Sequence, residues 1–222
     1  LADYIILYCL TDPDNPSRHQ RHSCIIVETD RPGLAATKIH GKMGIRASDT
    51  AELSLTDLRV PKENLIGERG EGFAQFMAFF NRTRLHIAAQ GIGVAQGALD
   101  MATRHVKNRV QFGRPLAALQ AVQFKIAEMA TRVEASRSLL YRAASLADQG
   151  IFDHKLIAMA KWTAGETGVR VTDEALQLHG GYGYLAEYDI ERFYRDAKIV
   201  ELYEGTKEVE KQVIARVILG KA

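Results

Sequence analysis

The sequence predicts a mainly α-helical fold, in which a C-terminal up-down helical bundle follows a partial antiparallel β-domain. Residues 1–66 contain short apolar runs rich in β-branched and aromatic side chains, and turns that contain Pro and Gly separate these runs. Residues 67–222 instead repeat apolar side chains at steps of three and four, the period of a helix face. We therefore expect two domains, 1–66 and 67–222.

The β-domain is expected to contain three or four strands. Tyr4–Tyr8 and Cys24–Val27 are continuous apolar runs, whereas Ala51–Leu58 alternates apolar and polar residues as a half-buried strand does. A complete independent sheet domain would usually have more strands, so we expect only part of one. Cys9 and Cys24 lie inside strand-like stretches without metal-ligand spacing, and we interpret them as buried thiols in a reducing compartment.

The first long helix is expected to open at Asn81-Arg82-Thr83-Arg84, directly after an aromatic run. Its predicted buried face consists of Leu85, Ala88, Ile92, Ala95, Leu99, Ala102 and Val106. The same segment is rich in small residues, which are Ala89, Gly91, Gly93, Gly97 and Ala98. Because Gly otherwise destabilises a helix interior by roughly 1 kcal/mol, these residues indicate close contact between helices.

Four further helices are predicted downstream. Gln120–Asp148 would be on the order of 40 Å long at the helical rise of about 1.5 Å per residue. Asp153–Leu178 follows it after Gly150, and the shorter segments Glu187–Val200 and Lys207–Leu219 complete the chain. Short loops between long helices favour antiparallel neighbours in a bundle.

Composition excludes several classes of function. The 222 residues have a formal net charge of +2, which is no electrostatic footprint for nucleic acid. No apolar run is long enough to span a bilayer, so we expect no membrane partner. The seven histidines follow no ligand pattern, and we therefore expect no metal.

Glu204 stands directly before Gly-Thr, between two helix-like segments. Thr206 is a plausible N-cap for the last helix, so Glu204 is expected to project from a helix junction. A carboxylate held there could act as a base in a desolvating pocket. A solvated acid near a helix N-terminus is the alternative interpretation of this motif.

Two loop motifs could bind an anionic or aromatic ligand. Arg109–Leu116 offers two arginines, an amide and an aromatic ring, although a basic helix end followed by a Pro stop would look the same. Gln177–Tyr184 contains successive glycines that can form an anion-binding concavity, or simply stop a helix. Its G-x-G-x-x-A pattern follows a helix rather than a strand, which excludes a dinucleotide-binding fold there.

In this order, four motifs resemble the acyl-CoA dehydrogenase family: Asn-Arg-Thr-Arg, Arg-Val-Gln-Phe-Gly, Gln-Leu-His-Gly-Gly-Tyr-Gly and Arg-Asp-Ala-Lys-Ile-Val-Glu-Leu-Tyr-Glu-Gly-Thr. The resemblance covers essentially the whole chain but only the later part of the family's chain. It implies the end of the middle β-domain, followed by the C-terminal helical domain that binds FAD and forms oligomers. We therefore expect a fragment without the family's N-terminal helical domain and without the first flavin-contacting β-loops.

The resemblance also implies an activity. Family members bind FAD and oxidise an acyl-CoA thioester to the trans-2-enoyl-CoA, while a carboxylate removes the α-proton and the β-hydrogen leaves as hydride to the flavin. By motif position Glu204 would be the catalytic base. Some relatives carry the base immediately before the Arg of the first long helix, where this chain has Thr83, and this favours Glu204.

The resemblance assigns the remaining site residues. The residues implied to contact FAD are Arg109, Gln111, Phe112, Gln120, Gln177, Gly180, Gly181, Thr206 and Glu208. Those implied to line the acyl-CoA site are Asn81, Arg84, Tyr203 and Gly205. Arg109, Gln111 and Phe112 would reach the cofactor across a subunit interface. Asn81 stands where many relatives have Asp, and Glu208 where relatives often have Gln.

The implied partners are an acyl-CoA, an electron-transfer flavoprotein and further copies of the chain in a dimer of dimers. The implied location is the cytoplasm of a prokaryote or the mitochondrial matrix, with a soluble protein. Two alternatives remain open, an acyl-CoA oxidase-like flavoenzyme and a flavin-free helical interaction module. Fast reoxidation by oxygen would indicate the first alternative, and a protein without a flavin spectrum the second.

Overall fold

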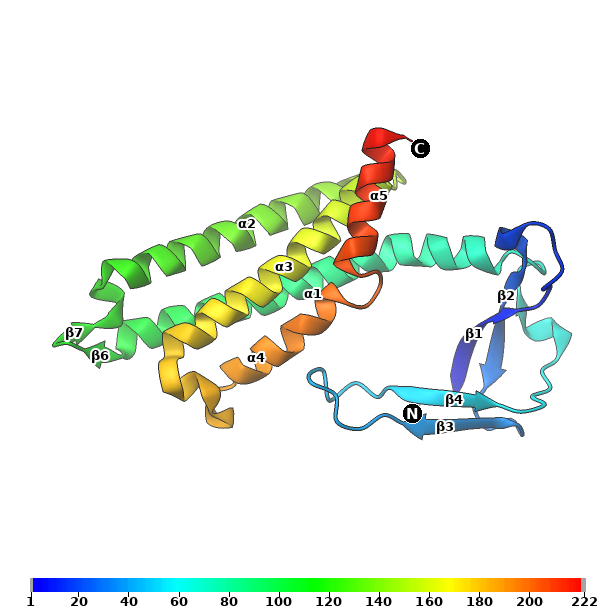
Figure 1. Cartoon of the computed structure of the whole chain (residues 1–222), viewed down its shortest axis with the longest axis horizontal. Helices are drawn as coiled ribbons and strands as arrows, with labels where there is room; N and C mark the ends of the chain where they lie inside the picture. Colours follow the sequence, from blue (N-terminus) through cyan, green and yellow to red (C-terminus); the bar gives the residue numbers. More distant parts are fainter. Residues whose placement is uncertain (1, 221–222) are drawn as a thin grey trace. The chain divides into compact units, whose positions relative to one another are not determined.

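The computed structural model describes residues 2–220 and divides them into two compact units (Figure 1). One unit comprises the chain up to Lys42 together with Arg46–Phe80, and the other comprises Met43–Ile45 and the chain from Asn81 onward. This division falls inside a helix, and a domain boundary at residue 67 stays a sequence prediction. The mainly helical fold class with a small antiparallel β part is confirmed.

The first unit contains two antiparallel sheets. β1 (Tyr4–Leu10), β2 (His22–Glu28) and β5 (Leu65–Ile66) form one in the order β1-β2-β5, and Cys24 of β2 pairs with both Tyr8 and Ile66. β3 (Leu34–Lys38) and β4 (Ala51–Leu55) form the other. The sequence patterns indicated β1, β2 and β4 but not the short strands β3 and β5.

Two expectations about burial in this unit are wrong. β4 is exposed at all five positions, with Leu53 and Leu55 41% and 44% accessible, because neither face of its two-stranded sheet is covered by another described part of the unit. Alternating apolar and polar residues show which side chains point to the same face of a strand. That face is buried only if another layer packs against it. Cys24 is buried as expected, but Cys9 is only half-buried.

The first helix, α1, runs from Gly72 to Asn108 and therefore begins nine residues before the expected start at Asn81. The preceding aromatic run is itself a helix face, because Phe73, Phe76 and Phe80 follow at steps of three and four. In the first unit, Phe76 stacks on Tyr8 of β1 with ring centroids 4.7 Å apart.

The second unit is a helical bundle in which chain direction alternates along α1, α2 (Gln120–Asp148), α3 (His154–His179) and α4 (Ile190–Ala197) (Figure 1). A tight hairpin of β6 (Val110–Gln111) and β7 (Arg114–Pro115) joins α1 to α2, and α5 (Lys207–Leu219) ends the described chain. The predicted helices at α2, α3 and α5 are confirmed.

The expected helix Glu187–Val200 is wrong as a single element. Asp189 has a positive φ of 47° and separates a short 3₁₀ turn, Ala186–Tyr188, from α4. A second 3₁₀ turn, Lys198–Glu201, then follows α4. Helical periodicity continues across these breaks, so the sequence pattern did not reveal them.

Helix α3 is the centre of the bundle and packs against α2, α4 and α5. The predicted buried face of α1 is confirmed from Ala88 to Val106, whereas Leu85 at its edge is half-buried. Gly91 provides the expected close contact, since an added Cβ would lie 2.9 Å from the Ala164 carbonyl oxygen of α3. Gly93 faces open space instead. In residues 2–220, no helix is both long enough and apolar enough to cross a membrane.

Candidate functional site

Glu204 lies in a tight turn between the 3₁₀ segment Lys198–Glu201 and α5. Its φ is +55°, and Gly205 follows with a φ of +104°. The Thr206 hydroxyl accepts a hydrogen bond from Val209 N at 3.5 Å, which confirms the expected N-cap. Non-glycine residues adopt positive φ at a cost, and such strain is concentrated at functional sites.

Two consecutive residues of α1 hold Glu204. The Thr83 hydroxyl donates to Glu204 Oε2, and Arg84 Nε donates to the Glu204 backbone carbonyl at 3.0 Å. In the sequence, Thr83 marked only the position where some relatives carry the base. In the structure, its hydroxyl orients the carboxylate of Glu204, the predicted base of this chain. The structure thus brings together Arg84 and Glu204, which are 120 residues apart in sequence.

The neighbouring predicted substrate residues lie around the same turn. The Tyr203 hydroxyl donates to Gln90 Oε1 of α1, and burial raises the pKa of Tyr203 although this hydrogen bond opposes the shift. Asn81 is half-buried on α1, three residues before Arg84. Thr83, Arg84 and Gln90 therefore contact the turn from one stretch of α1.

The sequence did not identify two buried charges beside this turn, Lys161 of α3 and Glu210 of α5. They are only 1% and 0% accessible. Lys161 Nζ donates to the Gly205 carbonyl, and Glu210 Oε1 makes an ion pair with Arg84 Nε at 3.1 Å. Burial lowers the pKa of Lys161 and raises the pKa of Glu210, because each charged form loses hydration.

A periodicity signal for these charges exists in the sequence. Lys161 follows buried Ile157 by four residues on α3, and Glu210 precedes Ile214 by four on α5. A charge at helical spacing on an apolar face marks a buried polar contact.

The predicted cofactor residues between α1 and α2 lie on the β6–β7 hairpin. Phe112 and Gly113 form its turn with φ values of +54° and +74°, and the Phe112 side chain is 85% exposed. Arg109 lies just after α1, with its guanidinium 5.1 Å from the centroid of the Tyr182 ring. Gln111 of β6 and Gln120, the first residue of α2, are both exposed.

The C-terminal end of α3 meets the hairpin through this Arg109–Tyr182 contact. A pocket of about 430 Å³ there is lined by Arg104, His105, Asn108, Arg109, Tyr182 and Tyr188. Gln177 is exposed on the last turn of α3, and Gly180 follows the helix with a φ of +61°. Added Cβ atoms at Gly180 and Gly181 would meet nothing within 4 Å, so the backbone there is open to a ligand.

The predicted cofactor residues therefore form two groups within one chain. Thr206 and Glu208 lie with the Glu204 turn, where Lys161 of α3 also makes contact, whereas the other group lies around the C-terminal end of α3 at His179 and the β6–β7 hairpin. Lys161 and His179 are 179 − 161 = 18 residues apart on α3, or about 27 Å. Figure 1 shows the hairpin and the start of α5 at different ends of the long helices.

Glu208 is exposed in the first turn of α5. Its own backbone N–H and the Thr206 side chain lower its pKa, as expected for an acid at a helix N-terminus. The Glu208 carboxylate therefore interacts with the N-terminus of α5 in this structure.

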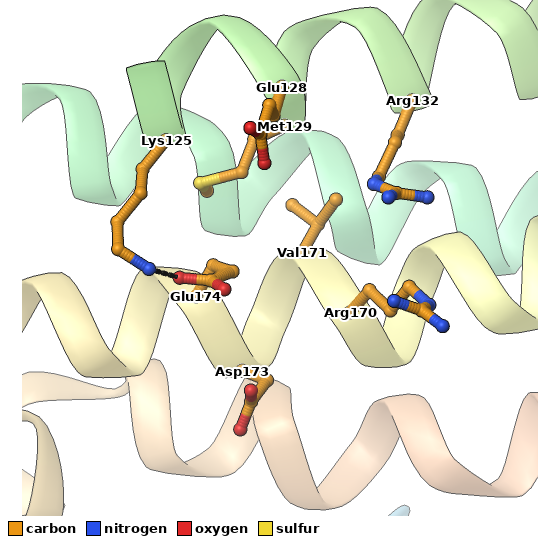
Figure 2. A pocket seen from close by; sticks show the side chains of 8 residues that line it. All are labelled: Lys125, Glu128, Met129, Arg132, Arg170, Val171, Asp173 and Glu174. Carbon is orange, nitrogen blue, oxygen red and sulfur yellow. Dashed lines mark hydrogen bonds and ion pairs between the residues drawn. The ribbon is translucent and has the colours of Figure 1, made fainter. Parts of the chain in front are cut away.

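A separate charged groove of about 150 Å³ between α2 and α3 contains none of the predicted site residues (Figure 2). Lys125 points across it to an ion pair with Glu174, and its walls carry three charges of each sign. Among residues 2–220, no three His, Cys, Asp or Glu side chains are grouped so that they could hold a metal ion.

Comparisons with known proteins give one family. The family model described as "Acyl-CoA dehydrogenase, C-terminal domain" matches residues 70–219. An acyl-CoA dehydrogenase of Bacillus subtilis is 45% identical over 99% of this chain and 57% of its own length. The caffeyl-CoA reductase-Etf complex subunit CarC of Acetobacterium woodii is 42% identical over 100% of this chain and 58% of its own.

A solved structure agrees with these matches. Butyryl-CoA dehydrogenase from Megasphaera elsdenii superposes with a TM-score of 0.93 at 42% identity, covering 98% of this chain and 56% of that chain. The chain thus spans a little over half the length of the relatives that it matches.

Proposed function

The chain belongs to the acyl-CoA dehydrogenase family, and from this premise we propose that it supplies the catalytic base and part of the FAD site of an enzyme that converts an acyl-CoA thioester to the trans-2-enoyl-CoA. The observation that carries the proposal is the turn at Glu204. A non-glycine residue is held there at positive φ, with its carboxylate bound by Thr83 and its carbonyl by Arg84.

In this proposal Glu204 removes a proton from the α-carbon of the thioester. Thr83 donates to Oε2 and restricts the orientation of the carboxylate, so that the other oxygen remains available as proton acceptor. Arg84 fixes the backbone on which that carboxylate is mounted. FAD, when bound, would supply an acceptor for the hydride that leaves the β-carbon.

The predicted cofactor residues around the β6–β7 hairpin and the C-terminal end of α3 have side chains and backbone that fit the phosphate and adenine end of FAD. Arg109 provides a guanidinium for phosphate oxygens, and the exposed ring of Phe112 can pack on a flat heterocycle. The open backbone at Gly180 and Gly181 could approach the same ligand, with Gln111, Gln120 and Gln177 as exposed amides nearby. Thr206 and Glu208 would serve the flavin end.

The distance of about 27 Å between the two groups along α3 supports a cofactor site shared by two copies of the chain. We propose a homo-oligomer, a dimer of dimers, in which the hairpin of one copy completes the site of another. Electron transfer to an electron-transfer flavoprotein is proposed because a relative is a subunit of an Etf complex. Asn81, Tyr203 and Gly205 would line the acyl-CoA side.

The test is anaerobic reduction of the FAD-loaded protein by a short-chain acyl-CoA, followed at the flavin absorption band. Glu204→Gln should bind FAD as the unaltered protein does but reduce it on the order of 10²–10⁴-fold more slowly, the usual contribution of a general base. Glu187→Gln is the matched control, since Glu187 is an exposed acid in a 3₁₀ turn. Equal reduction rates for Glu204→Gln and the control would refute the assignment of the base.

The cofactor residues have their own test. Phe112→Gly should relieve the positive φ at the hairpin while removing the exposed ring, so FAD binding should weaken although the hairpin is no less stable. Equilibrium titration with FAD measures the first effect, and urea unfolding measures the second. Unchanged FAD affinity would remove Phe112 from the proposed cofactor site.

A further inference from the structure

Both carbonyl groups of the Glu204–Gly205 dipeptide accept a hydrogen bond from a cationic side chain. Arg84 Nε of α1 reaches the Glu204 carbonyl at 3.0 Å, and Lys161 Nζ of α3 reaches the Gly205 carbonyl. These donors come from different helices, so the turn is fixed from two directions. Glu204 has a positive φ, which a non-glycine residue keeps only where the surroundings determine it strongly. Gly205 also has a positive φ, which glycine adopts without this cost.

On its own helix, Lys161 lies among apolar side chains. It is 1% accessible, and Ile157, Ala160 and Ala164 around it on α3 are fully buried or nearly so. An apolar side chain of similar length would fill this space without the desolvation penalty of a buried cation. The hydrogen bond to the Gly205 carbonyl is the interaction that an apolar replacement could not make.

Glu210 supplies the opposite charge from α5. Its carboxylate is fully buried and makes an ion pair with Arg84. A Cβ on residue 205 would lie 2.3 Å from Glu210 Oε1, so the carboxylate occupies the space directly beside Gly205. Within the described part of the chain, neither oxygen accepts a hydrogen bond with good geometry, and its action is therefore electrostatic.

We propose that Lys161 and Glu210 are positioning residues for the catalytic base: Lys161 clamps the Gly205 carbonyl, and Glu210 balances the charges of Lys161 and Arg84, the two cations that hold the turn. This inference rests on the proposed role of Glu204. Neither residue donates to or accepts from the Glu204 carboxylate, so both act through the backbone of the turn.

Hydrogen–deuterium exchange tests the clamp without any cofactor. Lys161→Met keeps the length and apolar stem of the side chain but removes the donor, and the amides of residues 204–209 should exchange at least about tenfold faster. Amides in the middle of α2 should not change. Lys125→Met is the matched control, because Lys125 is a half-exposed lysine whose ion pair with Glu174 lies in the separate groove (Figure 2).

Activity gives the second readout. In the FAD-loaded protein, Lys161→Met should slow flavin reduction by acyl-CoA about tenfold or more, with KM for acyl-CoA and FAD affinity close to those of Lys125→Met. Lys161→Arg retains a donor and should restore part of the rate. Normal exchange at 204–209 in Lys161→Met would overturn the clamp, and so would a loss of rate without a change in exchange.

A pH profile separates positioning from mere packing. Lys161 is surrounded by Arg84 of α1, by Glu201 and Glu204 of the segment before α5, and by Glu210 of α5. Glu210 favours the charged form of Lys161, so Glu210→Gln should lower the pKa of Lys161 further and loosen the turn at a lower pH. Faster exchange at 204–209 should then begin at a lower pH than in the unaltered protein. An unshifted profile would refute the role of Glu210.

The proposed function and this inference fail in different ways. If Glu204→Gln reduces flavin normally, the assignment of the base is wrong whatever the exchange data show. If Glu204→Gln is inactive but Lys161→Met behaves as Lys125→Met in both assays, the base stands and the positioning role is wrong. Because Glu210→Gln conserves side-chain volume, it tests the network even if Lys161→Met does not fold.

Discussion

Two glycines on α1, only two residues apart, should respond to alanine in opposite ways. An added Cβ at Gly91 would lie 2.9 Å from the Ala164 carbonyl oxygen and 3.0 Å from Val200 Cγ1, whereas at Gly93 it would meet nothing within 4 Å. The Ala164 oxygen belongs to the backbone of central helix α3 and cannot turn away. The two substitutions therefore share a change in helix propensity but differ in packing.

The magnitudes follow from these two effects. Replacing Gly with Ala in a helix interior stabilises by about 1 kcal/mol, and this gain should appear in full for Gly93→Ala. Forcing an extra methyl into a packed contact destabilises by roughly 1–3 kcal/mol, so Gly91→Ala should be neutral or destabilising by up to about 2 kcal/mol. The propensity gain cancels in the comparison, which leaves Gly91→Ala about 1–3 kcal/mol less stable than Gly93→Ala.

Urea unfolding followed by tryptophan fluorescence measures this difference in the free energy of unfolding, because its signal comes from the helical unit that contains both glycines. The chain has one Trp, and Trp162 lies on α3 of the helical unit. A free energy of unfolding for Gly91→Ala that equals or exceeds that of Gly93→Ala would refute the close α1–α3 contact. It would also remove the explanation for the small residues along α1.

Three further predictions concern stability. Asp153→Ala should lower the free energy of unfolding by about 1 kcal/mol in the same urea assay, because Asp153 caps the N-terminus of α3. Burial, and then the stacked ring of His179, lower the pKa of His105 below its ordinary 6.5, so an unfolded chain binds a proton more readily than the folded one. Stability should therefore fall as the pH drops below 6.5, and His105→Gln should reduce that dependence in urea titrations above and below this pH. The hydrogen bond from Arg31, followed by one from the backbone N–H of Glu28 itself, lowers the pKa of Glu28 from 4.5 to about 2. The stabilising effect of the ionised Glu28 should therefore be present above pH 4.5 and lost as the pH falls toward 2. Acid titration of Glu28→Gln should no longer show this loss.

The helical half of the fold was largely predictable because its signals are local. The apolar spacing on α1, the periodicity of α2 and the Thr206 cap of α5 each indicate an element within a window of about 18 residues or fewer. The break at Asp189 was missed because a single residue with positive φ does not disturb the helical periodicity. The early start of α1 at Gly72 was missed because the aromatic run was not recognised as a helix face.

The candidate site was predictable in its motifs but not in its support. Glu204 and Arg84 could be named from their motifs and from resemblance to the acyl-CoA dehydrogenase family. Lys161 and Glu210 were missed although each stands at helical spacing from a buried apolar residue, because a single charged residue in a helix usually lies on the solvated face. Only the packing of α3 and α5 against the turn reveals that both are buried.

By itself, then, the sequence predicted most of the helices, the Thr206 cap, the candidate base and the family resemblance, because these depend on residues close together along the chain. Tertiary structure decided which charged side chains are buried, where the β-strands remain exposed, and how three helices surround one turn. The physical reason is that burial of a charge and the clamping of a strained turn depend on neighbours distant in sequence: Arg84 and Lys161 reach Glu204 and Gly205 across 120 and 44 residues. No local pattern contains such contacts, and the bundle must form before they exist.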